Sequence, residues 1–393
     1  MAPRAGASGW VKAHRARLIG GECAVGDNCA MGRAIDDGLD VMEDEEYGYE
    51  GERRKRRGPG FVLLMLCILV LVVVLGFVGF YVARSLTALN SIDRDEKLTP
   101  TEYAGRPASS EPKPAAPGQE EVAAPINFVL MGSDTAEGDS GRSDSLMVAH
   151  VTGDRQAVYL VSFPRDLWVD IPGRGKGKLN WAYAFGGPQL TVRTLEQLTG
   201  VRMDHTVNID FEGFMALTDA VGGVTVYNPW PTNQNPEHKF EQGEVQLQGE
   251  RALAYVRERY ELPNGDFDRA FRQRTVVKAI IRKLMTPETL ANPATFSNVV
   301  GQVADTMTVD TGMTNGYVTE LALSMRITSG ESIGLLQAPV KGVSMVGDQS
   351  VVVADLPGIQ NLSASLGGDT MDEYFAEHRG DAQDKLGQVE PPE

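Results

Sequence analysis

Residues 61–83 form an uninterrupted apolar run without a single charge, FVLLMLCILVLVVVLGFVGFYVA. As a helix this run would be about 35 Å long, which is enough to cross a bilayer. The basic cluster RRKRR at residues 53–57 precedes it, whereas only Arg84 follows it closely. Because basic flanks stay in the cytoplasm, we expect a single-pass membrane protein whose N-terminus is cytoplasmic and whose chain beyond residue 84 is extracellular. A cleaved signal peptide fits less well, since the run begins far from Met1 and exceeds a signal h-region in length.

Composition divides the rest of the chain into four parts. Residues 1–57 are acidic and Gly-rich in their second half and have no helical or strand period, which is typical of a disordered cytoplasmic arm. Residues 84–124 contain Pro, Ala, Ser and Glu without a core-forming pattern, so we expect an extended extracellular linker. Residues 125–360 contain the recurrent apolar segments of a folded domain. Residues 372–393 are charged and end in prolines, and we expect a loose C-terminal tail.

Strand and helix patterns alternate along the folded domain. The segments INFVLMG, LMVAHVT, AVYLVSF, HTVNIDF, GVTVYN, IGLLQAP and QSVVVADLP are typical of strands. The segments PQLTVRTLEQLTG, EGFMALTDAVGG and QGERALAYVRER, with residues 267–285, are typical of helices. This alternation predicts an α/β domain with a central mixed sheet flanked by helices. The three cysteines all precede residue 84, so no disulfide framework holds the exported part.

Several classes of function lack their usual residues. The formal net charge is −16, which argues against a general nucleic-acid-binding protein. The sequence contains no GxxxxGK[ST] or GxGxxG pattern for nucleotides, and no HExxH pair for zinc hydrolysis. A GxSxG nucleophile elbow is also missing. What remains is an excess of arginines with a few carboxylates. This composition favours a site that binds an anion, and it does not indicate a catalytic nucleophile from a side chain.

Two loops next to expected strands hold part of this charge. The loop GSDTAEGDSGRSDSLM presents Asp134, Arg142 and Asp144, where carboxylates and a guanidinium together suit a hard divalent cation and a phosphate. Arg165 lies just after another expected strand, behind Pro164, and Lys178 follows a Gly-rich loop whose backbone can approach an anion closely. An ordinary polar turn and a solvated basic hairpin are the structural alternatives for these loops.

A third segment, AYVRERYELPNGDFDRAFRQRTVV, gathers five arginines within eighteen residues: Arg257, Arg259, Arg269, Arg272 and Arg274. Arg269 and Gln273 are four positions apart and therefore share one face of the expected helix, with Arg272 close to that face. Asp266 stands at the start of this helix, where a carboxylate is favoured by the helix dipole. A surface helix laced with salt bridges is the alternative, but the grouping favours a site that grips a pyrophosphate.

With these segments the sequence resembles the LytR-CpsA-Psr (LCP) family. The matching blocks occur in family order: NFVLMGSD, GRSDSLM, VSFPRDLWVDIPG, KLNWAYAFGGP, DFEGFMALTDAVGGVTV and LAYVRERYELPNGDFDRAFRQ. They extend over roughly residues 126–285, with a weaker match to about 360. One departure is Ser145, where many relatives have Thr after the aspartate.

The resemblance implies a fold and a reaction. LCP proteins are Mg²⁺-assisted enzymes that transfer glycopolymers from a polyprenyl-pyrophosphate carrier onto the cell wall, usually onto the 6-hydroxyl of peptidoglycan N-acetylmuramic acid. A hydrophobic pocket takes the lipid tail. The chain is therefore expected to be a membrane-anchored phosphotransferase that attaches a glycopolymer, such as a teichoic acid, to peptidoglycan and binds no nucleic acid.

The same resemblance implies roles for individual residues. Asp134 and Asp144 would hold the metal, and Asp266 would orient the arginines or assist deprotonation of the acceptor. The pyrophosphate would be bound by Arg142, Arg165, Lys178, Arg257, Arg259, Arg269 and Gln273.

Three other functions remain open at this level. A polyprenyl-pyrophosphate pyrophosphatase would use water in place of the sugar acceptor, and a non-catalytic lipid-carrier binding protein would use the same arginines for binding alone. A transcriptional attenuator is a further alternative, but the expected cytoplasmic arm is short and contains no helix-turn-helix pattern.

Overall fold

The computed structural model describes residues 71, 87, 89–112, 122–133, 143–233, 236–284, 301, 303–304, 306–327 and 330–379. The chain divides into two compact units, Met1–Val62 and Leu63–Glu393, and every element named below belongs to the second. The predicted cytoplasmic arm and, except for Leu71, the predicted membrane helix lie outside the described residues. No helix in the described ranges is long and apolar enough to span a bilayer.

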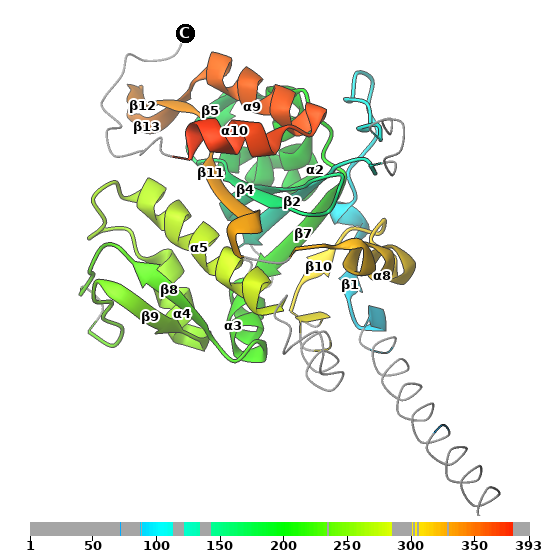
Figure 1. Ribbon diagram of the computed structural model, residues 1–393. Helices are drawn as coiled ribbons and strands as arrows, with labels where there is room; N and C mark the ends of the chain where they lie inside the picture. The colour runs from blue at the N-terminus through cyan, green and yellow to red at the C-terminus, as the bar shows by residue number, and fades with distance from the viewer. Residues whose placement is uncertain are drawn as a thin grey trace, which may run out of the picture. The chain divides into compact units, whose positions relative to one another are not determined.

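A seven-stranded mixed sheet, sheet A, lies at the centre of this unit (Figure 1). Its order is β1-β10-β7-β2-β3-β4-β11, in which β2 pairs parallel with β7 and antiparallel with β3, and β11 pairs parallel with β4. The predicted mixed sheet is thereby confirmed. The strands are β1 (Asp93–Arg94), β2 (Ile126–Ser133), β3 (Ser143–Val151), β4 (Val158–Ser162), β7 (His205–Asp210), β10 (Thr308–Val309) and β11 (Ile333–Gln337).

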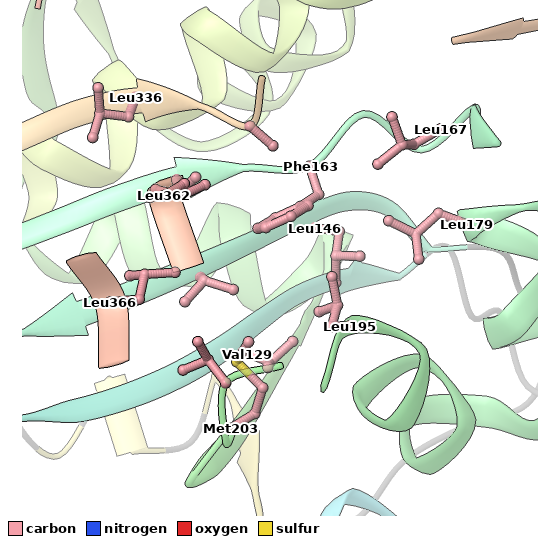
Figure 2. Close-up of a cluster of buried hydrophobic side chains, with 14 of the residues drawn as sticks. Val129, Leu146, Phe163, Leu167, Leu179, Leu195, Met203, Leu336, Leu362 and Leu366 are labelled. Carbon is pink, nitrogen blue, oxygen red and sulfur yellow. The ribbon is translucent and has the colours of Figure 1, made fainter. Parts of the chain in front are cut away.

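Both faces of sheet A are covered, because apolar residues occupy both sets of alternating positions in its central strands. On one face, Val148 and Val161 join a core with α2 (Leu179–Thr199), α9 (Leu356–Gly368) and α10 (Met371–His378). Figure 2 shows this cluster, in which leucines of α2 and α9 lie against the strands. On the other face, Ala149 and Leu160 lie in a second cluster with Val277 of α5 (Asp266–Leu284).

The α5 face carries a small subdomain. A two-stranded hairpin of β8 (Val224–Asn228) and β9 (Gly243–Leu247) packs with α3 (Phe211–Ala220), α4 (Gly249–Arg257) and α5 around a core of its own. Figure 1 shows this group and the α9–α10 pair on opposite sides of β4 and β2. The end of α4 and the beginning of α5 therefore lie over this face of sheet A.

A four-stranded sheet, sheet C, extends the fold beyond β4. Its order is β12-β13-β5-β6, formed by β12 (Val340–Val346), β13 (Gln349–Ala354), β5 (Leu167–Ile171) and β6 (Gly175–Lys178). Helix α2 follows β6 directly and is kinked at Gly186 and Gly187, so it consists of two helical segments. The remaining elements of the described residues are the 3₁₀ helices η1 (Glu96–Leu98) and η2 (Gly330–Ser332) and helix α8 (Asn315–Ser324).

The structure differs from the predicted boundaries at both ends of the domain. Part of the expected linker 84–124 is folded onto the domain: β1 pairs with β10, and Arg106, whose side chain is only 4% exposed, forms an ion pair of 2.9 Å with Glu196. The Pro-rich composition of residues 106–125 concealed this, because the buried apolar residues of the linker, such as Leu98, precede it.

The folded domain also continues past residue 360 through α9 and α10, so the expected loose tail 372–393 begins as a helix. Residues 380–393 lie outside the described residues.

Candidate active site

A cavity of about 770 Å³ lies between sheet A and the α3–α4–α5 group. This volume is within the usual range of small-molecule sites. Most of its walls are apolar, and they include Phe128, Leu130, Met147, Ala149, Val151, Val158, Val207, Ile209, Phe214, Leu217, Leu253, Val256, Val277, Ile280, Ile281, Leu284, Val303, Met307, Met325 and Ile327.

The polar residues that line the cavity lie at one end of the strand or helix to which they belong. In β3 they are Asp144 and Ser145 at the start of the strand, whereas later cavity residues of this strand are apolar. In α5 they are Arg269 and Gln273 in the N-terminal half, and the later cavity residues of the helix are again apolar. The cavity is therefore divided into a long apolar part and a polar end.

Two carboxylates and two guanidiniums are interleaved at this polar end. Arg165 donates a short hydrogen bond to Asp144, and its Nε lies 3.4 Å from Oδ1 of Asp266. The same Asp266 oxygen is 2.7 Å from Nη2 of Arg269. Arg269 also donates to the backbone oxygen of Asp144 at 3.3 Å. Residues far apart in the sequence are thus joined in one charged cluster, as their predicted common site requires.

Burial shapes the ionisation of this cluster. Burial raises the pKa of Asp266 above its ordinary value of 3.8, and the nearby charges of Arg269 and Arg165 oppose this only in part. Burial likewise lowers the pKa of Arg269, although Asp266 counteracts it. A carboxyl group with a raised pKa beside a substrate-sized cavity is suited to accept a proton.

Arg257 and Arg259 also line the cavity, but they differ from the first pair in their partners. The guanidinium of Arg257 lies 4.4 Å from the ring centroid of Phe211, and that of Arg259 lies 4.7 Å from the ring of Tyr260. Arg259 also donates to the Tyr260 hydroxyl at 2.8 Å. Within the described part of the chain, neither guanidinium is in a salt bridge with a carboxylate. Aromatic rings orient these two cations without neutralising them.

Two further predicted residues occupy supporting positions. Gln273 lines the cavity and donates to the backbone oxygen of Val256 at 3.3 Å, which ties α5 to the end of α4. Lys178 is not a cavity-lining residue; its Nζ lies 3.1 Å from Asp166, which in turn lies 3.8 Å from Arg165. Lys178 therefore adjoins the charged cluster through Asp166 and does not reach the cavity itself.

The other predicted positions divide into two groups. Asp134 and Arg142 lie outside the described residues, so their predicted roles stay predictions. Arg272 and Arg274 are described but lie away from the cavity walls. Arg272 is fully buried and donates to Asn228 at 3.0 Å and to the backbone of Trp230 at 2.8 Å. Burial lowers the pKa of Arg274 to about 10. Three of the five clustered arginines therefore face the cavity, and two are internal.

Sequence reasoning missed three residues of the site. Asp166 links Arg165 with Lys178, Phe211 supports Arg257, and Tyr260 supports Arg259 at the cavity rim. Asp166 was visible in the sequence as the residue after Arg165 in the segment FPRD. Tyr260 directly follows Arg259 in the sequence, whereas the contact of Phe211 had no local signal, since Phe211 is 46 residues before Arg257.

Comparisons with known proteins agree on one family. The family model described as LytR_cpsA_psr matches residues 80–366. The polyisoprenyl-teichoic acid–peptidoglycan teichoic acid transferase TagU of Enterococcus faecalis is 38% identical over 211 residues, which cover 53% of this chain and 68% of that protein. The protein of the same name from Bacillus mycoides is 44% identical over 160 residues, which cover 40% of this chain and 52% of that protein. The crystal structure of B. subtilis TagV has a TM-score of 0.56 and 26% identity, covering 62% of this chain and 96% of that one.

Proposed function

Because the chain belongs to the LytR_cpsA_psr family, we propose that it transfers a glycopolymer of the teichoic acid type from a polyprenyl-pyrophosphate carrier onto peptidoglycan. The observation that carries the proposal is the division of the cavity into an apolar part and an arginine-rich end. A lipid-linked pyrophosphate has the same division, with a hydrocarbon tail joined to a doubly charged head.

The apolar part of the cavity suits the polyprenyl tail. Such walls keep the tail out of water when it leaves the bilayer, and its exposure to water would cost roughly 25 cal/mol per Å² of apolar surface. A tail held there places the pyrophosphate next to Arg257 and Arg259, whose guanidiniums lie against the rings of Phe211 and Tyr260 and, among the described residues, are in no salt bridge. Guanidiniums bind phosphate oxygens in a bidentate manner, which fixes the orientation of the head as well as its charge.

The chemical step is a displacement at phosphorus. The acceptor hydroxyl oxygen forms a bond to the phosphorus on the polymer side of the pyrophosphate, and the bond from this phosphorus to the bridging oxygen breaks. Polyprenyl phosphate leaves with the bridging oxygen, and the hydroxyl proton passes to a carboxylate. Asp266 is not itself a cavity-lining residue, but it contacts Arg165 and Arg269 at the polar end and its pKa is raised by burial, which suits it to that last role. The arginines stabilise the negative charge that develops on the phosphate oxygens.

A magnesium ion fits the donor chemistry at this end in part. Asp144 supplies a carboxylate at the cavity wall, and together with Asp134 it would hold the ion. Among the described residues, however, no group of three or more acidic or histidine side chains is placed to hold a metal. When bound, Mg²⁺ would neutralise phosphate charge, and the residues described above would bind and orient the head with or without it.

We further propose that the protein works at the outer face of the cell membrane, anchored by residues 61–83. The acceptor in the names of the relatives is peptidoglycan, which lies outside the membrane. The carrier lipid is confined to the bilayer, so a membrane helix would keep the cavity close to its donor.

The proposal is tested with the full-length protein, a polyprenyl-pyrophosphate donor carrying a short glycopolymer, peptidoglycan oligomers and Mg²⁺. Mass spectrometry is expected to detect glycan oligomers that carry the polymer through a phosphodiester. Arg257→Ala and Arg259→Ala are each expected to lower kcat/KM about 10- to 100-fold, as loss of a charge-assisted hydrogen bond implies. Arg282→Ala, an exposed arginine near the end of α5, serves as the matched control and should leave the rate unchanged.

Other outcomes of this experiment separate the alternatives. Release of polyprenyl phosphate without a glycan adduct would indicate a pyrophosphatase. Donor binding without turnover would indicate a non-catalytic carrier-binding protein. Turnover that both arginine variants retain would contradict the assignment of the pyrophosphate to this end of the cavity.

A further inference from the structure

Three aromatic side chains form a row beside the charged cluster and outside the cavity. Trp168 lies on β5, and Trp181 and Phe185 lie on the first segment of α2. The ring centroids of Trp168 and Trp181 are 6.1 Å apart, and those of Trp181 and Phe185 are 6.2 Å apart. None of the three lines the cavity, so the proposed binding of the carrier lipid leaves them without a role.

This row is continuous with the site. Arg165 stands three residues before Trp168, and Trp168 is the direct cross-strand partner of Lys178. Lys178 is joined to Arg165 through Asp166, at 3.1 Å and 3.8 Å. A ligand that reaches the charged cluster from this side therefore passes along the aromatic row.

Packing of the core does not account for the whole row. Phe185 is 47% exposed, although it is a large apolar side chain at the end of a helical segment. The ring of Trp181 packs against the backbone of Gly177, and a Cβ added to Gly177 would lie 2.7 Å from this ring. The Trp181 ring therefore cannot be buried more deeply. The kink at Gly186 and Gly187 ends the helical segment immediately after Phe185 and keeps its ring at the surface.

A cation borders the exposed end of the row. The guanidinium of Arg174, in the exposed β5–β6 turn, lies 5.4 Å from the ring centroid of Phe185. A surface that combines aromatic faces with cations fits a ligand that has flat C–H faces and negative charges.

We propose that Trp168, Trp181 and Phe185 form the platform on which the acceptor glycan strand lies, with its hydroxyl directed toward the charged cluster. Sugar rings present C–H groups that pack on aromatic faces, and the carboxylates of peptidoglycan are complementary to Arg174. The carrier lipid occupies the cavity and the acceptor strand lies outside it, so the two substrates meet at Arg165. This inference rests on the proposed transfer to peptidoglycan.

The test measures the acceptor and the donor separately on the full-length protein. Phe185→Ala and Trp181→Leu are expected to raise the KM for peptidoglycan oligomers about 3- to 10-fold each, the size expected for loss of one ring contact. The KM for the lipid-linked donor should stay unchanged, since neither ring lines the cavity. Tyr227→Ala is the matched control, because Tyr227 is also an exposed aromatic residue, 59% exposed, but lies on the β8–β9 hairpin.

A binding measurement keeps the two proposals distinguishable. Peptidoglycan oligomers titrated without donor should change the tryptophan fluorescence of the wild-type protein and of Tyr227→Ala, and do so more weakly for Phe185→Ala. Glycan binding that depends on Phe185 in a protein without transfer activity would support the platform and contradict the proposed function. Transfer activity with an unchanged acceptor KM in both ring variants would overturn the platform and leave the proposed function standing.

Discussion

At the scale of single residues, Asp266 connects ionisation to the reaction. Its pKa is raised mainly by burial, so the carboxylate form accumulates only as the pH rises through a value above 3.8. If the carboxylate accepts the acceptor proton, kcat should fall as the pH decreases through that raised pKa. Asp266→Asn should lower kcat by about 10²- to 10⁴-fold, the usual contribution of a general base, and the residual activity should lose this acid limb. Rates measured from pH 4 to 8 check both expectations.

The stability of the Asp266→Asn variant supplies the control for this experiment. A carboxyl group whose folded pKa is raised favours folding at low pH, and that contribution is lost as the pH rises through the folded pKa. The asparagine variant should therefore stay folded at neutral pH, although Arg269 and Arg165 lose a partner. Asp348→Asn, in an exposed turn, is the matched change. An unaltered acid limb in Asp266→Asn would assign the proton to another group.

The arginines illustrate how far the sequence alone could go. Helical spacing correctly placed Arg269 and Gln273 on one face, which lines the cavity. Arg272 was expected near that face, yet its guanidinium lies 4.3 Å from the ring of Tyr255 inside the subdomain. Arg272 follows Arg269 by three residues, so its side chain points between the cavity and the β8–β9 hairpin. The position of the hairpin decides which of the two the side chain contacts. Periodicity within a helix cannot supply that position.

At the scale of elements, Arg272 fastens α5 to the hairpin. It donates to Asn228 at the end of β8 and to Trp230 just beyond it. Arg272→Met keeps most of the side-chain volume and removes these bonds, so it should lower the free energy of unfolding by roughly 1.5–3 kcal/mol. Denaturant unfolding measures this loss, and Arg282→Met on the exposed face of α5 should show almost none. Equal stability of the two variants would contradict the fastening role.

The kink of α2 is a second property of an element. Gly187 has φ 63° and ψ −158°, a conformation that side chains oppose sterically. Gly187→Ala should therefore destabilise the protein by about 1–3 kcal/mol. Gly316→Ala, in the first turn of α8, has no positive φ and should be neutral or slightly stabilising. Thermal unfolding compares the two, and an unchanged Tm for Gly187→Ala would indicate that the kink relaxes without cost.

Elements were predictable where their signals are local. The proline and final glycine of PQLTVRTLEQLTG correctly predicted the second segment of α2. Its first segment was missed, because Gly186 and Gly187 separate it from that pattern. Strands β5 and β6 were not among the predicted strands, although a basic hairpin was the structural alternative for this segment; they are short, and β6 consists of GKGK, which has strand character only through its pairing with β5. Long-range pairing, not propensity, forms such strands.

At the scale of the whole domain, the cavity exists because sheet A and the α3–α4–α5 group do not close against each other. Ala149 of β3 is a small residue on its wall, 7% exposed. Ala149→Phe should place a ring in the apolar part, leave Tm unchanged or raised because apolar surface is buried, and obstruct a long lipid tail. The KM for a donor with a long polyprenyl chain should rise at least tenfold, whereas the KM for a donor with a short chain, which needs only the polar end, should stay unchanged.

Ala376→Phe, on the exposed face of α10, is the control and should alter neither KM. An equal effect on both donors would mean that the ring disturbs the arginines, and no effect on either would place the lipid outside this cavity.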